Sequence, residues 1–244
     1  MLEVKNIHKK FGTNEVLKGV DFKVEKGSVI AVLGNSGSGK TTLLRCISFL
    51  EQADKGEITF DDFHKDITAV TRKEIRQLRM KMGFVFQGYN LFRNKTALDN
   101  VLEGLTIARK NSPEEAKKKA MEMLEKVGMA DRTNFYPDQQ QQRVAIARAI
   151  AYNPEVVLFD EPTSALDPRL TGEVLDVMRK LADEGTTMVV VTHEMDFARK
   201  VANWVVYMED GVIVEEGPSK EFFSQPKSEK TMAFLHMTSS DYVI

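Results

Sequence analysis

Residues 34–41 read GNSGSGKT, a GxxxxGK(S/T) pattern. The apolar run 29–33 precedes it and the amphipathic stretch 43–50 follows it, so the pattern lies between a predicted strand and a predicted helix. Glycines let the backbone turn tightly enough to point N–H groups inward, while the helix start and the Lys40 ammonium add positive charge. The stretch therefore predicts a loop that holds the phosphates of ATP or GTP.

The residue types of this loop also predict a metal ligand. Thr41 is expected to place its hydroxyl on the Mg²⁺ ion that accompanies a bound nucleotide. A flexible Gly/Ser linker, the plainer alternative, would need neither Lys40 and Thr41 after the last glycine nor a strand before and a helix after. The residues expected to contact the nucleotide are Gly34, Asn35, Ser36, Gly37, Ser38, Gly39, Lys40, Thr41 and Thr42.

Composition narrows the class of protein further. The chain has 244 residues, 42% of them hydrophobic, which is ordinary for a globular protein and excludes disorder as its main state. Lys and Arg total 34 against 36 Asp and Glu, so the net charge of −2 gives no general reason to expect nucleic-acid binding. The longest apolar runs, such as 156–159 and 188–191, are far shorter than the ~20 residues of a membrane-spanning helix. Any link to a membrane is therefore expected to pass through a partner.

Cysteine content and the N-terminal sequence favour the cytoplasm. The single cysteine, Cys46, precludes an internal disulfide, and its apolar neighbours predict a buried thiol. The N-terminal sequence MLEVKNIHKKFG alternates in hydrophobicity like a strand and lacks the apolar core of a signal peptide. The expected location is therefore cytoplasmic.

Strand and helix signals alternate along most of the chain. In the range 88–153, however, strand signals are almost absent: Thr96 caps a helix that runs to about Arg109, and Ser112 opens another that ends near Gly128. Elsewhere, strands are predicted at 2–7, 16–24, 29–33, 57–60, 82–86, 156–159, 187–192, 204–209 and 212–215, and helices from Thr71, at 168–184 and at 194–201.

Alternation of this kind around a phosphate loop predicts an α/β fold. We expect a P-loop NTPase core, with a mainly parallel sheet covered by helices, together with an N-terminal antiparallel β subdomain. The expected organisation is one domain, 1–244, in which 1–87 and 154–244 form the nucleotide-binding core and 88–153 form an inserted helical subdomain.

Two carboxylates follow the apolar run 156–159, which is the Walker B arrangement. Because the carboxyl ends of parallel strands converge, Asp160 is expected to reach the metal at Thr41, and Glu161 to face the γ-phosphate and polarise the attacking water. The plainer alternative is a surface acidic pair at the turn of Pro162.

With both Walker motifs present, the chain resembles the ATP-binding subunit of ABC transporters over essentially its full length. Gln87 resembles the Q-loop glutamine, which in that family contacts the metal and the attacking water and connects the site to the membrane subunits. Ser164 and Asp167 resemble the D-loop, and His193 resembles the switch histidine that contacts the γ-phosphate. Phe11 resembles the aromatic residue that stacks on adenine, although a phenylalanine at the edge of the core is the alternative.

The resemblance thus implies two sets of site residues. The catalytic set is Glu161, His193 and Gln87. The metal ligands are Thr41, Gln87 and Asp160.

The largest departure from the family lies at its signature motif. The family carries Leu-Ser-Gly-Gly-Gln at the start of the helix that here reads QQQRVAIARAI, but this chain passes from Asp138 and Gln139 directly to Gln140, so that Leu-Ser-Gly-Gly is absent. In the family, the serine and glycines of one subunit contact the γ-phosphate held by a second, head-to-tail copy. The implied dimer interface includes Asp138, Gln139, Gln140, Ser164 and Asp167.

The absent residues predict slow hydrolysis. Four residues of helix span up to ~6 Å, whereas a hydrogen bond tolerates only about 3.2 Å between donor and acceptor. Loss of one oriented donor to a developing charge lowers a rate by about 10²–10³, so we expect ATP binding with poor turnover. A natural deletion, an engineered deletion and a loop left out of the sequence would all give this pattern.

The segment FQGYNLFRNKTALDNV resembles the ATPases of bacterial importers for polar amino acids, with Asn94 in place of the usual histidine. This branch implies a second copy of the chain, two transmembrane permease subunits, an indirect link to an extracytoplasmic solute-binding protein, and a position on the inner face of the cell membrane. Leu91 and Phe92 would suit a socket for the permease, or would pack within the helical segment. Two other classes stay open: a soluble ABC-type ATPase acting on DNA or ribosomes, and a non-hydrolytic ATP-binding regulator.

Overall fold

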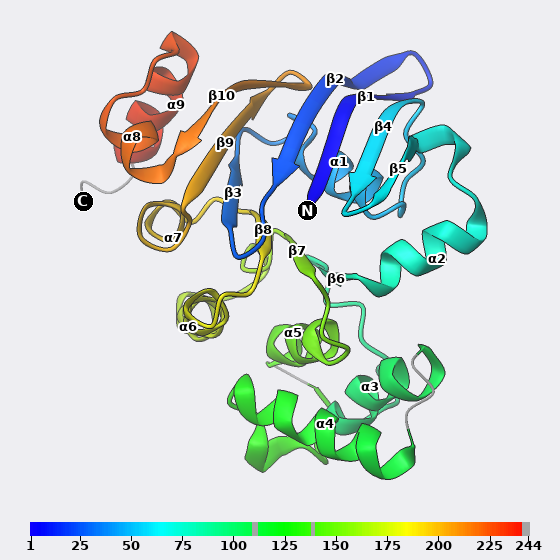
Figure 1. The fold of residues 1–244 in the computed structure, drawn as a ribbon. Helices are drawn as coiled ribbons and strands as arrows, with labels where there is room; N and C mark the ends of the chain where they lie inside the picture. The colour runs from blue at the N-terminus through cyan, green and yellow to red at the C-terminus, as the bar shows by residue number, and fades with distance from the viewer. Residues whose placement is uncertain (109–111, 138–139, 241–244) are drawn as a thin grey trace. The chain divides into compact units, whose positions relative to one another are not determined.

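The apolar run before the phosphate loop forms β3, Val29–Leu33, in which every residue is buried. A strand of this kind is typical of the interior of a parallel sheet. The computed structural model describes residues 1–108, 112–137 and 140–240, which fold into two compact units (Figure 1). The first unit comprises Met1–Arg79 and Thr187–Ile244, and the second comprises Met80–Thr186.

An antiparallel sheet of four strands lies in the first unit, in the order β2-β1-β4-β5. It confirms the expected N-terminal antiparallel part, and its strands extend beyond the predicted ranges. The strands are β1 (Leu2–Phe11), β2 (Asn14–Val24), β4 (Lys55–Phe60) and β5 (Phe63–Asp66). The sequence of β5, FHKD, contains one apolar residue and predicts no strand, so its pairing with β4 forms it.

The second sheet of this unit carries the phosphate loop, in the order β10-β9-β3-β8. β3 pairs in parallel with β8 and β9, whereas β9 and β10 are antiparallel. Asp210 and Gly211 form the turn between these last two strands, with φ values of 50° and 83°. The remaining strands are β8 (Met188–Val191), β9 (Trp204–Glu209) and β10 (Val212–Pro218).

Carboxylates fix the starts of two helical segments in the first unit. The Glu74 carboxylate accepts hydrogen bonds of 2.8 and 2.7 Å from the backbone N–H and the hydroxyl of Thr71, where a helix start was predicted. The Glu215 carboxylate accepts the N–H groups of Lys227 and Ser228, both at 2.9 Å, just before α9. The helices are α1 (Lys40–Ile47), α2 (Arg72–Met80), α7 (Met195–Lys200), α8 (Ser219–Ser224) and α9 (Glu229–Ser240), with α8 and α9 beside β10 (Figure 1).

Two parallel strands lie in the second unit, β6 (Met82–Val85) and β7 (Val156–Asp160). Every residue of β7 is buried, in keeping with its apolar sequence. Helices α3, α4 and α5 pack together in this unit. The helices are α3 (Ala97–Glu103), α4 (Pro113–Lys126), α5 (Gln141–Ile150) and α6 (Pro168–Asp183), with further helical turns at Gly104–Ala108 and Ala130–Arg132.

The helix that Thr96 caps changes type along its predicted length. Regular α-helix extends to Glu103 and continues as a π-helical turn, Gly104–Ala108, up to one residue before the predicted end at about Arg109. Glycine has a low helix propensity, and the Thr106 hydroxyl donates a 2.9 Å hydrogen bond to a carbonyl of the preceding turn. Residue 109 itself lies outside the described residues.

The inserted helical subdomain at 88–153 stays a prediction. The described residues of that range form helices, helical turns and loops, and none of them belongs to a strand. The compact unit that contains them, Met80–Thr186, is larger, because it also includes β6, β7 and α6.

Candidate nucleotide-binding site

The phosphate loop closes around its own lysine. Lys40, the first residue of α1, is buried, and its ammonium donates hydrogen bonds of 2.8 Å to the carbonyls of Gly34 and Asn35. Within the described residues no side chain caps α1, whose N-cap residue is Gly39. Backbone N–H groups at the positive end of a helix thus lie next to a buried ammonium, an arrangement that fits a phosphate chain.

Close packing fixes the shape of the loop. Gly34 has a φ of 149°, and a Cβ there would overlap the carbonyl oxygen of Met208 on β9. Gly39 has a φ of 102°, and a Cβ there would lie 2.9 Å from the carbonyl oxygen of Val16 on β2. The loop is therefore held between β9 and β2, and only glycine fits at these two positions.

His193 leaves its strand at the same sheet edge as the loop. β3 and β8 are parallel neighbours, and Val32 of β3 lies opposite Val191 of β8. Gly34 lies two residues after Val32, and His193 lies two residues after Val191. Adjacent strands lie about 4.8 Å apart. The exposed His193 and the phosphate loop, both expected at the γ-phosphate, thus emerge side by side in the first unit.

Phe11 lies at the end of β1, opposite Asn14 of β2. Its side chain is 48% exposed, which fits either an adenine-stacking ring or a phenylalanine at the edge of the core. β2 contacts the start of α1 near Val16, which places this hairpin next to the phosphate loop. An exposed ring at this place suits a nucleotide base, and its stacking on adenine stays a prediction.

In the second unit, three expected site residues leave parallel strands at one edge. Val85 lies opposite Phe159, so Gln87 and Glu161 each follow that pair by two residues. Asp160 ends β7 and is buried, which excludes the alternative of a surface acidic pair. Glu161 has a φ of 45°, and strain of this kind at a residue with a Cβ is typical of functional sites.

The two D-loop residues have local structural roles. The Asp167 carboxylate accepts the N–H of Leu170 at 2.9 Å and so caps α6, whose first residue is Pro168. The Ser164 hydroxyl donates a 3.1 Å hydrogen bond to the carbonyl of Glu161. Both side chains are exposed, and their place in a dimer interface stays a prediction.

The shortened signature segment is described only in part. Asp138 and Gln139 lie outside the described residues, and Gln140 directly precedes α5, which no side chain of the described residues caps. Gln142 is buried, and its amide donates a 3.4 Å hydrogen bond to the carbonyl of Phe86. This glutamine, in the first turn of α5, therefore faces inward within its own unit.

Sequence reasoning missed two residues that shape the loop after Gln87. Asn100 is buried on α3, where its carbonyl accepts the N–H of Phe92 at 2.8 Å and its amide donates to three carbonyls of the same region. Arg148 on α5 donates to two consecutive loop carbonyls. A charged residue inside the apolar run VAIARAI is the signal that could have revealed Arg148.

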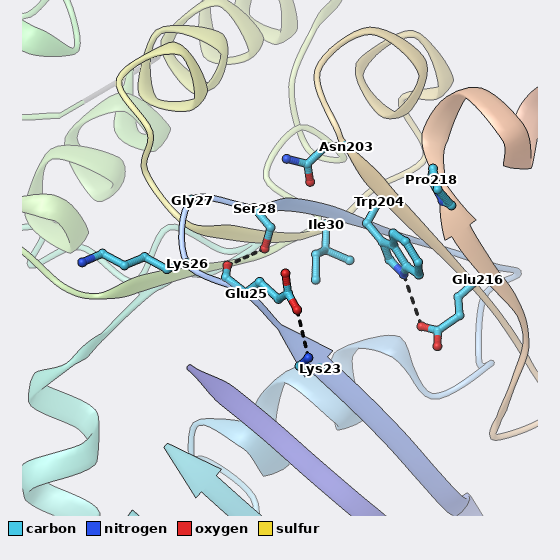
Figure 2. A pocket seen from close by; sticks show the side chains of 10 residues that line it. All are labelled: Lys23, Glu25, Lys26, Gly27, Ser28, Ile30, Asn203, Trp204, Glu216 and Pro218. Atoms are coloured by element: carbon cyan, nitrogen blue, oxygen red, sulfur yellow. Dashed lines mark hydrogen bonds and ion pairs between the residues drawn. The ribbon is translucent and has the colours of Figure 1, made fainter. Parts of the chain in front are cut away.

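A separate hollow of about 540 Å³ lies at the opposite edge of the phosphate-loop sheet (Figure 2). The indole N–H of Trp204 donates a 3.4 Å hydrogen bond to the Glu216 carboxylate on one side, and Lys23 pairs with Glu25 at 2.9 Å on the other. The hollow lies at the amino ends of β3 and β9, whereas the phosphate loop follows the carboxyl end of β3. It is therefore distinct from the predicted nucleotide site.

Known proteins resemble this chain over nearly all of its length. A family profile described as "ABC transporter" matches residues 17–164. The "L-cystine import ATP-binding protein TcyC" of Bacillus subtilis (strain 168) is 56% identical, over 97% of this chain and 98% of that protein. The "L-cystine transport system ATP-binding protein TcyN" of Escherichia coli (strain K12) is 52% identical, over 96% of each chain.

A solved structure supports the same assignment. It is described as the dimeric, post-hydrolysis state of an ATP-binding cassette bound to ADP and Pi, and it covers 90% of this chain and 99% of its own. The two share 36% sequence identity with a TM-score of 0.80, which confirms the α/β P-loop NTPase fold class. The chain therefore belongs to the ABC transporter family, as one of its ATP-binding subunits.

Proposed function

We propose that this subunit hydrolyses MgATP and thereby powers the import of a polar amino acid. The buried ammonium of Lys40 beside an uncapped helix start carries this proposal. The phosphates replace the carbonyls of Gly34 and Asn35 as partners of that ammonium, and the first N–H groups of α1 donate to the same phosphates. His193, at the same sheet edge, donates to the γ-phosphate.

The residue types fit Mg²⁺ as the accompanying ion. The Thr41 hydroxyl, the Gln87 amide and the buried Asp160 carboxylate supply hard oxygen ligands. No three His, Cys, Asp or Glu side chains cluster among the described residues, and a magnesium ion that takes most of its ligands from phosphates and water needs no such cluster. When bound, the ion neutralises charge on the phosphates.

Glu161 polarises the attacking water in this proposal. Glu161→Gln keeps the size of the side chain and removes its basic oxygen, so kcat is expected to fall by about 10²–10⁴ with ATP affinity unchanged. Glu155→Gln is the matched control, because Glu155 lies just before β7 and its carboxylate pairs with the Lys81 ammonium at 3.1 Å. Phosphate release by the purified complex measures both variants. A Glu161→Gln enzyme with full turnover would remove Glu161 from this role.

The names of the relatives support amino-acid import, with L-cystine as the first substrate to test. In the described part of the chain, no helix is long and apolar enough to cross a membrane. On the basis of the names of these relatives, we propose that the chain lies on the inner face of the membrane, bound to two permease subunits that receive solute from an extracytoplasmic binding protein. Phe92, exposed in the loop that Asn100 and Arg148 fix, supports a permease contact there. The dimeric solved relative supports a pair of subunits, which we propose to be arranged head to tail.

Uptake by proteoliposomes tests this assignment. Vesicles that contain the copurified permease, this subunit and internal ATP are expected to take up L-cystine when its binding protein is added, and Lys40→Ala is expected to abolish the uptake. Glutamine uptake in place of L-cystine would keep the import function and correct the substrate. Copurification with ribosomes or DNA, without a permease, would contradict the proposal.

We further propose that hydrolysis is slow in this chain because the segment before α5 is short. The signature motif of the family, Leu-Ser-Gly-Gly-Gln, opens this helix, whereas this chain passes from Gln139 directly to Gln140. Insertion of Leu-Ser-Gly-Gly between Gln139 and Gln140 is expected to raise kcat by about 10² or more. An insertion of four alanines controls for length. Equal turnover in all three chains would contradict this second proposal, and no turnover in any of them would favour a non-hydrolytic regulator.

A further inference from the structure

Lys9 connects the exposed ring of Phe11 with the segment that follows α1. The Lys9 side chain is only 10% exposed. Its ammonium donates a 2.7 Å hydrogen bond to the carbonyl of Gln52 and pairs with the Glu51 carboxylate at 2.8 Å. The same nitrogen lies 4.9 Å from the centroid of the Phe11 ring, a cation–π contact.

Two more hydrogen bonds tie the end of β1 to this segment. The N–H of Lys10 donates to the Asp54 carboxylate at 2.6 Å, and the N–H of Asp54 donates to the carbonyl of His8 at 2.9 Å. The segment that contains Glu51, Gln52 and Asp54 directly follows α1, and the phosphate loop directly precedes α1. The strand end that carries Phe11 is therefore joined to the helix that carries the phosphate loop.

The Lys9 ammonium keeps its charge at neutral pH. Burial by itself lowers the pKa of a lysine, but the hydrogen bond and charge of Glu51, with Asp54 at 3.9 Å, raise the pKa of Lys9 above its ordinary value overall. A charged ammonium attracts the electron-rich face of an aromatic ring. Because the Phe11 side chain is still 48% exposed, this contact orients the ring and leaves part of it open to a ligand.

We infer that Lys9 is a positioning residue for the nucleotide base, because it fixes the Phe11 ring in advance at the place where adenine stacks. The inference rests on the proposed function, ATP binding, and on the prediction that adenine stacks on Phe11. A ring that is ordered before binding loses less conformational freedom when the base arrives, so affinity for the base rises. A lysine that only stabilised the sheet would have no effect specific to the base.

Two probes separate base binding from phosphate binding in the full chain: ATP, and tripolyphosphate, which has no base. Lys9→Met is expected to weaken ATP binding about fivefold and to leave tripolyphosphate binding unchanged. Lys9→Arg, which keeps a cation, should restore most of the ATP affinity. Lys10→Met is the matched control, since Lys10 is 56% exposed and its ammonium lies 3.9 Å from the Glu15 carboxylate. The Lys10→Met chain should bind ATP and tripolyphosphate as tightly as the unaltered chain does.

A double-mutant cycle tests whether Lys9 acts through the ring. In a Phe11→Ala background, Lys9→Met should cause no further loss of ATP affinity. A full fivefold loss in that background, or an equal loss for tripolyphosphate, would overturn the inference. If Phe11→Ala left ATP affinity unchanged, both the stacking of adenine on Phe11 and this inference would be wrong. The phosphate site is tested separately, because loss of tripolyphosphate binding in Lys40→Ala would still support it. Should Lys9→Met not fold, Lys9→Gln also removes the cation, keeps a polar side chain, and gives the same comparison.

Discussion

The guanidinium of Arg148 donates a 2.7 Å hydrogen bond to the backbone carbonyl of Asn90, and a second, of 3.0 Å, to that of Tyr89. Both loop residues have positive φ values, 60° at Tyr89 and 52° at Asn90. This conformation costs a residue with a Cβ about 1–2 kcal/mol, and a hydrogen bond from a charged donor offsets about 1.5–3 kcal/mol. Arg148 therefore holds the loop after Gln87 in a strained shape.

Arg148→Ala is expected to lower the free energy of unfolding by about 2–3 kcal/mol, because both charged hydrogen bonds are lost. Amide hydrogen exchange at residues 89–92 should become faster, and kcat should fall if Gln87 acts from this loop. Arg79→Ala is the matched control, since Arg79 donates to two carbonyls in the same manner, those of Ser48 and Phe49 in the first unit. Arg79→Ala should lower the free energy of unfolding but should not speed amide hydrogen exchange at residues 89–92. Unchanged exchange in Arg148→Ala would show that the loop keeps its shape without the arginine.

Glu74 is expected to titrate far below its ordinary range. Hydrogen bonds from the Lys65 ammonium, at 2.9 and 3.0 Å, followed by those from the hydroxyl and N–H of Thr71, lower the pKa of Glu74 from 4.5 to about 2. Because the folded pKa is lower than the unfolded one, the carboxylate stabilises the fold fully above pH 4.5 and loses this effect as the pH falls towards 2. The carboxyl ¹³C shift of Glu74, followed against pH, measures the value directly.

Lys65→Met separates the causes of that shift. The hydrogen bonds from Lys65 are the largest cause, so their removal should raise the pKa of Glu74 towards 4.5. The two hydrogen bonds from Thr71 stay in place in this variant. Lys55→Met removes an exposed lysine from the adjacent strand β4 and should leave the titration unchanged. A Glu74 pKa near 4.5 in the unaltered chain would mean that neither the Lys65 contact nor the Thr71 hydrogen bonds form in solution.

Glycine substitutions are expected to have three different outcomes. Gly34→Ala should abolish ATP binding, because the new Cβ would overlap the Met208 carbonyl. Gly37→Ala meets no atom within 4 Å, so only the strain of its φ of 81° remains, about 1 kcal/mol. Gly172→Ala, in open space on α6, should instead raise the free energy of unfolding by about 0.5–1 kcal/mol. Denaturant unfolding and ATP titration measure all three, and a Gly34→Ala chain that binds ATP normally would disprove the tight packing of the loop.

Neighbouring residues were enough to predict the phosphate loop, β7 and the helix start at Ser112, because each depends on spacing within a few positions. The contacts that shape the site could not be predicted in this way. Arg148 reaches a carbonyl 58 residues away, and Lys9 one 43 residues away, so both depend on how distant segments pack. The exposure of Phe11 likewise depends on the pairing of β1 with β2, so the sequence alone left both of its interpretations open.

Trp204 is expected to report on folding and on the hollow in Figure 2, but not on ATP binding. It is the only tryptophan in the chain, is 36% exposed, and lies opposite Ile30 near the amino end of β3. The phosphate loop begins beyond Leu33, so β3 separates the indole from bound phosphates by roughly 10 Å or more at about 3.3 Å per residue. Saturating ATP should therefore leave the emission maximum in place, whereas Glu216→Gln, which alters the carboxylate that accepts the indole N–H, should shift it. A large ATP-dependent change that disappears in Lys40→Ala would instead show that nucleotide binding alters the opposite edge of the sheet.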